Sequence, residues 1–260
     1  MTRVLVLGNS HAATLRRAFP AIGAAYPGLA LSFWGLPGGA FAKASTDAEG
    51  KLRPDPTDRV SLRKGAQWND QDHVDLTAYD RIFLVGLRFN LHAVLTICRA
   101  LQPLDRGPRE GALGVSDGFL RAALRAEVDA ALNAQLARTP LDSRVTLMPA
   151  PYPAARAVQR GSDLFEPVTA TVAQLEDAAL LMALYEAEII QAAGRRGLAL
   201  ALQPRSTLAR PFLTQDSCLE DPDRDVRHMN ADFGLRAFDA LLATAPPSHP
   251  AAAAAAPTTA

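Results

Sequence analysis

Ser10 lies in a short polar segment that could supply a nucleophile. The segment Gly8-Asn9-Ser10-His11 follows an entirely apolar run, Val4–Leu7, and precedes a stretch with helical spacing. A serine on such a turn exposes its hydroxyl, and the helix N-terminus supplies backbone N–H groups that can stabilise a developing oxyanion. The same residues also suit a structural role, because Asn and Ser are favoured helix N-caps.

A carboxylate and a histidine three residues apart, Asp225 and His228, stand near the other end of the chain. In this arrangement the carboxylate can hold one ring nitrogen while the other nitrogen faces a serine, which is the geometry that activates a hydroxyl nucleophile. The structural alternative is a loop carboxylate and a surface histidine that precede a helix capped by Asn230.

Alternating strands and helices are expected to position these groups. Fully apolar or nearly apolar runs predict strands at Val4–Leu7, Leu29–Trp34, Arg81–Gly86, Val145–Met148 and Leu198–Leu202. Helices are predicted after the first strand, at 91–101, 117–137 and 174–195, and from Asn230 to about Thr244. This order predicts a doubly wound three-layer α/β/α sandwich, in which ligands bind outside the carboxyl ends of the strands.

Long connections are predicted near the same edge of the sheet, at 36–78, 103–116 and 150–170. Residues 40–78 show no long periodicity, and we expect a large irregular connection with one short hairpin. The first and third of these connections are expected to shape a pocket. The chain from Ala245 to Ala260 is rich in Ala and Pro and is predicted to be unstructured, which leaves residues 1–244 as the domain.

Composition excludes several classes of protein. The 260 residues carry 27 Lys+Arg and 27 Asp+Glu, and this balance gives no electrostatic reason to expect a nucleic-acid binder or a membrane-surface protein. Two cysteines, Cys98 and Cys218, are too few for a disulfide scaffold or a Cys-rich zinc site. The most apolar later stretch, Ala178–Ile190, is interrupted by Glu186 and Glu188 and falls short of a membrane span. No signal-peptide core is found, and a cytoplasmic location is expected.

The sequence resembles the SGNH, or GDSL-type, hydrolases over roughly residues 3–243. Gly8-Asn9-Ser10 is similar to the first block of that family, and Asp225-Val-Arg-His228 to the last. The resemblance implies a flavodoxin-like fold with a five-stranded, mostly parallel sheet. It also implies Ser10 as the nucleophile, His228 as the general base and Asp225 as the carboxylate that orients it, with no metal and no organic cofactor.

The two middle blocks of the family would complete an oxyanion hole with the N–H of Ser10. The segment Gly35-Leu-Pro-Gly38-Gly39 stands where the second block belongs. The resemblance points to the backbone N–H of Gly38 as the donor to the oxyanion, with Gly39 or Gly35 as alternatives. The third block departs from the family's Gly-x-Asn, since the chain reads Gly86-Leu-Arg88-Phe-Asn90. We expect Asn90 to reach the hole through a longer turn and help hold the oxyanion; the alternative is that Arg88, a possible pocket residue together with His11 and Gly39, takes its place. His11 either lines the pocket or lies on the helix surface.

Three functions fit these residues. The leading hypothesis is a serine esterase that hydrolyses an acyl ester of a small molecule or glycan. An O-acyltransferase that passes the same acyl group to a glycan hydroxyl would use the same residues. A catalytically weak binding module with the SGNH fold is the third hypothesis, and it rests on the irregular third block.

Overall fold

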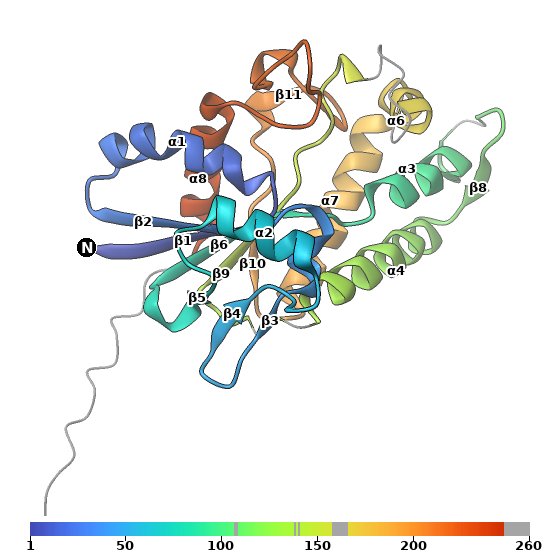
Figure 1. Ribbon diagram of the computed structural model, residues 1–260. Helices are drawn as coiled ribbons and strands as arrows, with labels where there is room; N and C mark the ends of the chain where they lie inside the picture. The colour runs from blue at the N-terminus through green and yellow to red at the C-terminus, as the bar shows by residue number, and fades with distance from the viewer. Residues whose placement is uncertain (107–108, 138, 140, 158–165, 247–260) are drawn as a thin grey trace, which may run out of the picture.

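A five-stranded parallel sheet forms the centre of the protein, as a computed structural model shows (Figure 1). The structure describes residues 1–106, 109–137, 139, 141–157 and 166–246. The sheet has the strand order β10-β9-β6-β1-β2, which is the flavodoxin-like order, and every pair of neighbours is parallel. Its strands are β1 (Thr2–Gly8), β2 (Leu29–Gly35), β6 (Arg81–Leu87), β9 (Val145–Pro149) and β10 (Ala199–Leu200).

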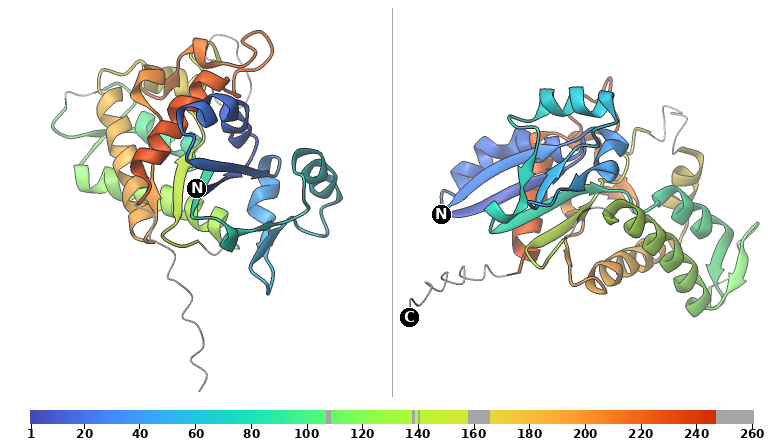
Figure 2. Two further views of the ribbon diagram at one scale, coloured as in Figure 1. Left: turned by 90° about the vertical axis from the view of Figure 1, so that its left-hand side faces the viewer. Right: turned by 60° about the horizontal axis from the view of Figure 1, so that its bottom comes forward.

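Two helices from opposite ends of the chain cover one face of this sheet (Figure 2). Helix α1 (Ala12–Ala25) packs against α8 (Ala231–Thr244), and both bury apolar side chains on β1 and β6. Gly234 of α8 allows the close approach, because a Cβ at this position would lie 2.5 Å from the Thr14 carbonyl oxygen. The cap predicted at Asn230 is present, since its Oδ1 accepts from the Phe233 N–H at 3.0 Å.

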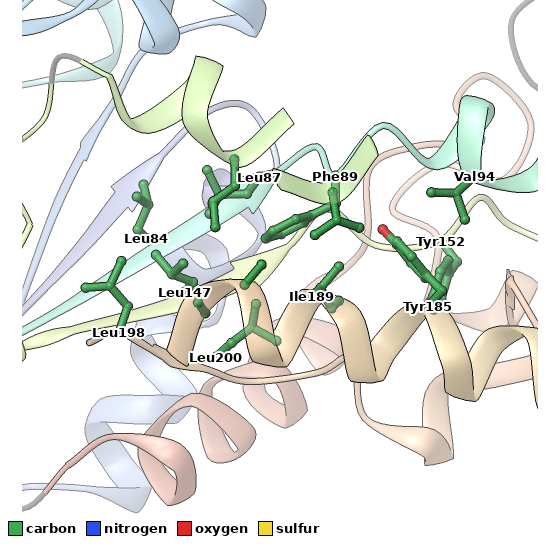
Figure 3. Close-up of a cluster of buried hydrophobic side chains, with 14 of the residues drawn as sticks. Leu84, Leu87, Phe89, Val94, Leu147, Tyr152, Tyr185, Ile189, Leu198 and Leu200 are labelled. Carbon is green, nitrogen blue, oxygen red and sulfur yellow. The ribbon is translucent and has the colours of Figure 1, made fainter. Parts of the chain in front are cut away.

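Three further helices cover the other face, where the larger apolar cluster lies (Figure 3). These are α3 (Leu91–Ala100), α4 (Asp117–Leu136) and α7 (Ala178–Gly194), and the shorter α6 (Glu166–Ala173) packs on α3. The helices predicted at 91–101 and 117–137 are confirmed. The helix predicted at 174–195 begins four residues later, and α6 precedes it in a segment for which no helix was predicted. The layers together confirm the predicted α/β/α sandwich.

The connection at 40–78 contains the predicted short hairpin, formed by its first two strands, but it also contains a third strand and a helix that were not predicted. Strands β3 (Ser45–Thr46), β4 (Lys51–Arg53) and β5 (Val74–Asp75) form a separate antiparallel sheet, and α2 (Arg59–Trp68) lies between the last two. Turns η1 (Gly38–Lys43) and η2 (Leu76–Ala78) flank them. Strands of two or three residues are too short to show a period, and burial of Leu52 in the main core fixes the middle strand.

The remaining elements are short and lie at the ends of the longer ones. Strands β7 (Leu101–Pro103) and β8 (Leu113–Val115) form a parallel pair, and β11 (Leu208–Arg210) and β12 (Leu213–Thr214) an antiparallel pair. Turns η3 (Arg205–Thr207) and η4 (Asp216–Cys218) adjoin the second pair. Within the described ranges, no helix has the length and apolar character needed to cross a bilayer. The unstructured tail was predicted for 245–260, and 247–260 lies outside the described residues.

Candidate active site

The turn that carries Ser10 is locked to the neighbouring strand by Asn9. The Asn9 amide donates to the Gly86 carbonyl oxygen at 2.6 Å, and its Oδ1 accepts from the His11 N–H at 3.0 Å. Gly86 has φ +91°, and a Cβ there would clash with the Asn9 side chain. The ends of β1 and β6 are therefore held together by one side-chain amide that requires glycine opposite it.

Ser10 is half-buried in this turn and does not cap the helix. The N-cap residue of α1 is His11, which makes no side-chain cap bond. The Ser10 hydroxyl has no hydrogen-bond partner among the described residues. Of the two residues that could cap the helix, only Asn9 bonds a backbone N–H at its start, that of His11. The Ser10 hydroxyl is therefore not engaged in capping.

Asp225 and His228 form a hydrogen-bonded pair before α8. Asp225 Oδ2 bonds the His228 Nδ1, while Oδ1 accepts from the backbone N–H groups of Arg227 at 2.7 Å and His228 at 3.2 Å. Burial of the Asp225 carboxyl raises its pKa, but the bonds from His228 and the two N–H groups outweigh burial, and the net pKa is lowered. The carboxylate is thus kept ionised and directs the ring, so that Nε2 is the nitrogen left for other contacts.

His11 lies directly against His228. Their ring centroids are 5.6 Å apart with an interplanar angle of 36°, and His11 Nδ1 is buried without a hydrogen-bond partner in the described part of the chain. Burial, followed by the charges of His228 and Arg88, lowers the pKa of His11 to about 4. The ring is therefore neutral at physiological pH. This contact links the Ser10 turn to the Asp225–His228 pair, although 217 positions separate the two histidines.

The two alternatives for the third block have different surroundings. Asn90 has φ +50°, begins α3, and its amide donates to Glu127 Oε2 on α4 at 2.6 Å. The backbone of Arg88 is held by Gln135 of α4, whose Oε1 accepts from the Arg88 N–H at 2.7 Å. The Arg88 guanidinium is exposed, forms no ion pair with a described residue, and is close enough to depress the pKa of His11.

A cavity of about 710 Å³ opens at the carboxyl edge of the sheet. Asn9 and His11 after β1, Gly38 and Gly39 after β2, and residues 84–92 from β6 to the start of α3 line its mouth and wall. The cavity continues past residues 149–153 after β9 and Gln203 after β10, between α4 and α7. The first and third of the long connections thus contribute to the lining, whereas no described residue of 103–116 does.

Some of the predicted site residues line this cavity and others do not. Gly38, Gly39, His11, Arg88 and Asn90 line it. Ser10, Asp225 and His228 are not among the lining residues in the described part of the chain, although their immediate neighbours Asn9, His11 and Arg227 are.

The polar lining residues that the sequence did not indicate include Tyr152, Glu186 and Gln203. The signal for Tyr152 was its position just after a strand end. The signal for Glu186 was a charge inside the most apolar helix. The described residues contain no group of three or more His, Cys, Asp or Glu side chains placed to hold a metal ion.

Comparison with known proteins gives no family assignment. No family model matches the chain, and no curated protein matches it. One similar solved structure is described as a GDSL-like lipase from Bacteroides thetaiotaomicron, with 11% identity, a TM-score of 0.37, and coverage of 93% of this chain and 86% of that chain. Another, a DUF4886 family protein from Bacteroides uniformis, has 12% identity and a TM-score of 0.41, with coverage of 95% and 87%. Both TM-scores are below 0.5, and neither likeness carries an argument here.

Proposed function

We propose that the protein is a serine esterase that hydrolyses an acyl ester through an acyl-enzyme. The observation that carries the proposal is the Asp225–His228 hydrogen bond beside the Ser10 turn, where the ring of His11, the residue after Ser10, contacts the ring of His228. A histidine oriented by a carboxylate and a serine with an uncommitted hydroxyl are the groups that acyl transfer requires. The resemblance of both segments to the SGNH hydrolases supports the same roles.

In the proposed reaction Ser10 Oγ attacks the ester carbonyl while His228 Nε2 takes the hydroxyl proton. The new Oγ–C bond forms, the carbonyl oxygen becomes an oxyanion, and collapse breaks the ester C–O bond as His228 returns the proton to the leaving alcohol. Water then attacks the acyl-enzyme by the same route and releases the acid and Ser10. Asp225 stabilises the imidazolium that exists between the proton transfers.

The oxyanion would lie against the N–H groups of Ser10 and Gly38, with a third donor after β6. Gly38 lines the cavity and has φ +50°, and beyond its chain neighbours no atom lies within 4 Å of the position that a Cβ would take there. We assign the third donor to Arg88, because the Asn90 amide already donates to Glu127. For Asn90 to serve instead, its side chain would have to leave Glu127.

A catalytically weak binding module is the second candidate function. It is favoured by one observation, the absence of a hydrogen bond from the Ser10 hydroxyl to His228 or to any other described residue. Hydrogen bonds in active sites often tighten only when substrate binds, and the esterase is therefore kept as the first candidate.

Covalent labelling tests the esterase proposal. A fluorophosphonate probe should label the wild-type protein, and the wild type should hydrolyse 4-nitrophenyl esters. Ser10→Ala should abolish labelling, and His228→Ala should slow it by several orders of magnitude. Ser32→Ala, which changes a half-buried serine of β2 away from the site, is the matched control and should label normally. Equal ester turnover by wild type and Ser10→Ala would reject the esterase and leave the binding module.

A further inference from the structure

The cavity has a polar wall at the end remote from Ser10. Most of its lining is apolar, but Glu186 of α7 and Tyr152 after β9 both face it. Tyr152 lies in the buried cluster with Tyr185, Phe89 and Ile189 (Figure 3). The Tyr152 hydroxyl donates to Glu186 Oε1 at 3.2 Å, and Arg205 pairs with Oε2. The Glu186 side chain is only 4% exposed, so a carboxylate is enclosed next to an open cavity.

This carboxylate has accepting capacity that the protein does not fill. Two oxygens offer about four acceptor positions, and Tyr152 and Arg205 are its side-chain partners among the described residues. Burial of Glu186 raises its pKa, while the charge of Arg205 and the two hydrogen bonds oppose that shift. The Arg205 charge also balances the carboxylate, which favours a neutral donor over a second cation.

Packing alone does not require a carboxylate at this position. Ile189, on the next turn of the same helix, lines the same cavity with an apolar side chain. Enclosing a charged group costs free energy unless its hydrogen bonds are satisfied, so a ligand that completes them would be bound selectively.

The distance between the two ends sets the size of the ligand. Neighbouring strands are about 4.8 Å apart, so the residues after β9 and β10 lie about 10 to 14 Å across the sheet edge from those after β1. An extended chain covers about 1.2 Å per bond. Glu186 bonds Tyr152, which follows β9 two strands from β1, so a group bound at this pair would stand at least about eight bonds from a carbonyl carbon held at Ser10.

We propose that Glu186 and Tyr152 bind a hydroxyl group near the far end of the acyl chain, so that the substrates are esters of medium-length hydroxyacyl groups. The hydroxyl donates a hydrogen bond to Glu186 and carries no charge. The apolar walls of the cavity contact the methylenes between the hydroxyl and the ester. That the ligand carries an ester, and that this ester lies at Ser10, rests on the proposed esterase function. Binding of a hydroxyl at Glu186 does not.

Binding to the full-length Ser10→Ala protein tests this without turnover. Calorimetry would compare methyl 8-hydroxyoctanoate, 10-hydroxydecanoate and 12-hydroxydodecanoate, each with its unsubstituted counterpart. At least one hydroxylated ester should bind about tenfold more tightly than its counterpart, because a hydrogen bond to a charged group is stronger than one between neutral groups. Equal affinities in all three pairs would overturn the inference, even if the wild type hydrolyses the corresponding 4-nitrophenyl esters.

Matched variants assign the preference to the polar wall. Glu186→Gln in the Ser10→Ala background should reduce the preference below about threefold. Glu188→Gln should keep it, because Glu188 is equally buried on α7 but pairs with Arg125 and does not line the cavity. Equal losses in both variants would overturn the inference. If Glu186→Gln does not fold, Tyr152→Phe removes a single hydroxyl and should also weaken the preference. Selective binding without any ester turnover would retain the hydroxyl site and reject the esterase.

Discussion

The buried histidine beside His228 makes the stability of the protein depend on pH in a way that one substitution should remove. The pKa of His11 is lowered from 6.5 to about 4 by burial and by the charges of His228 and Arg88. Below pH 6.5 the unfolded chain binds a proton at this position that the folded protein does not bind. The free energy of unfolding therefore falls as the pH falls. Well above pH 6.5, His11 makes no pH-dependent contribution to it.

The size of this contribution follows from the two pKa values. At pH 8 both states hold a neutral His11 and the contribution is close to zero. At pH 5 the unfolded state is protonated and the folded state is mostly neutral, which destabilises the folded protein by about 2 kcal/mol. The limit below pH 4 is about 3 kcal/mol.

His11→Asn removes the titrating group and keeps a polar side chain of similar length. Urea unfolding of wild type and variant at pH 8, 7, 6 and 5 gives the difference in free energy of unfolding at each pH. Titrating groups that do not interact with His11 are common to both proteins and cancel. The difference should move in favour of the variant by about 2 kcal/mol between pH 8 and pH 5. A pH-independent difference would show that His11 is not held neutral in the folded protein and would refute the reasoning.

Three further substitutions test the proposed site and the packing that positions it. Asp225→Asn should lower kcat for ester hydrolysis by about three to four orders of magnitude, with little change in KM, because the amide cannot stabilise the His228 imidazolium; a loss below tenfold would contradict the proposed role. Arg88→Met should lower kcat by about two to three orders of magnitude if the guanidinium contacts the oxyanion, and an unchanged kcat in steady-state assays would return that role to Asn90. Gly234→Ala places a Cβ 2.5 Å from the Thr14 carbonyl, and it should lower the free energy of unfolding by about 1 to 3 kcal/mol in a urea titration; an unchanged midpoint would mean that α8 moves away from α1 without cost.

The sequence was most informative where burial is complete on both faces of an element. Val4–Leu7 and Arg81–Gly86 are nearly uninterrupted apolar runs, and they became the central strands β1 and β6 with ends shifted by at most two residues. Helix α2 and strand β5, both in 40–78, were missed because their formation depends on distant contacts. The Asn69 side chain, for example, bonds both the N–H and the carbonyl oxygen of Gly35, 34 residues away.

In the candidate site too, pairs close in sequence could be predicted, whereas pairs far apart in sequence could not. Asp225 and His228 are three residues apart, so their spacing alone predicted that they could pair. The Asn9 bond to Gly86 spans 77 residues, and the Tyr152 bond to Glu186 spans 34. Local patterns carry no information on such pairs. The sheet order, which brings the ends of β1, β6 and β9 to one edge, and the packing of α7 on the sheet make them neighbours.

The position of His228 relative to Ser10 is set by helix packing and not by a covalent connection between their segments. Thr14 of α1 donates its hydroxyl proton to the Met229 carbonyl oxygen at 3.1 Å, across 215 residues of sequence, and both groups are buried. Because Ser10 precedes α1 and His228 precedes α8, this bond fixes the starts of the two helices side by side. A change in the angle between α1 and α8 therefore moves the histidine away from the serine turn while Asp225, which is held by the same loop, moves with it. The Asp225–His228 pair behaves as one unit, and its distance from Ser10 is the quantity that the core between the two helices controls.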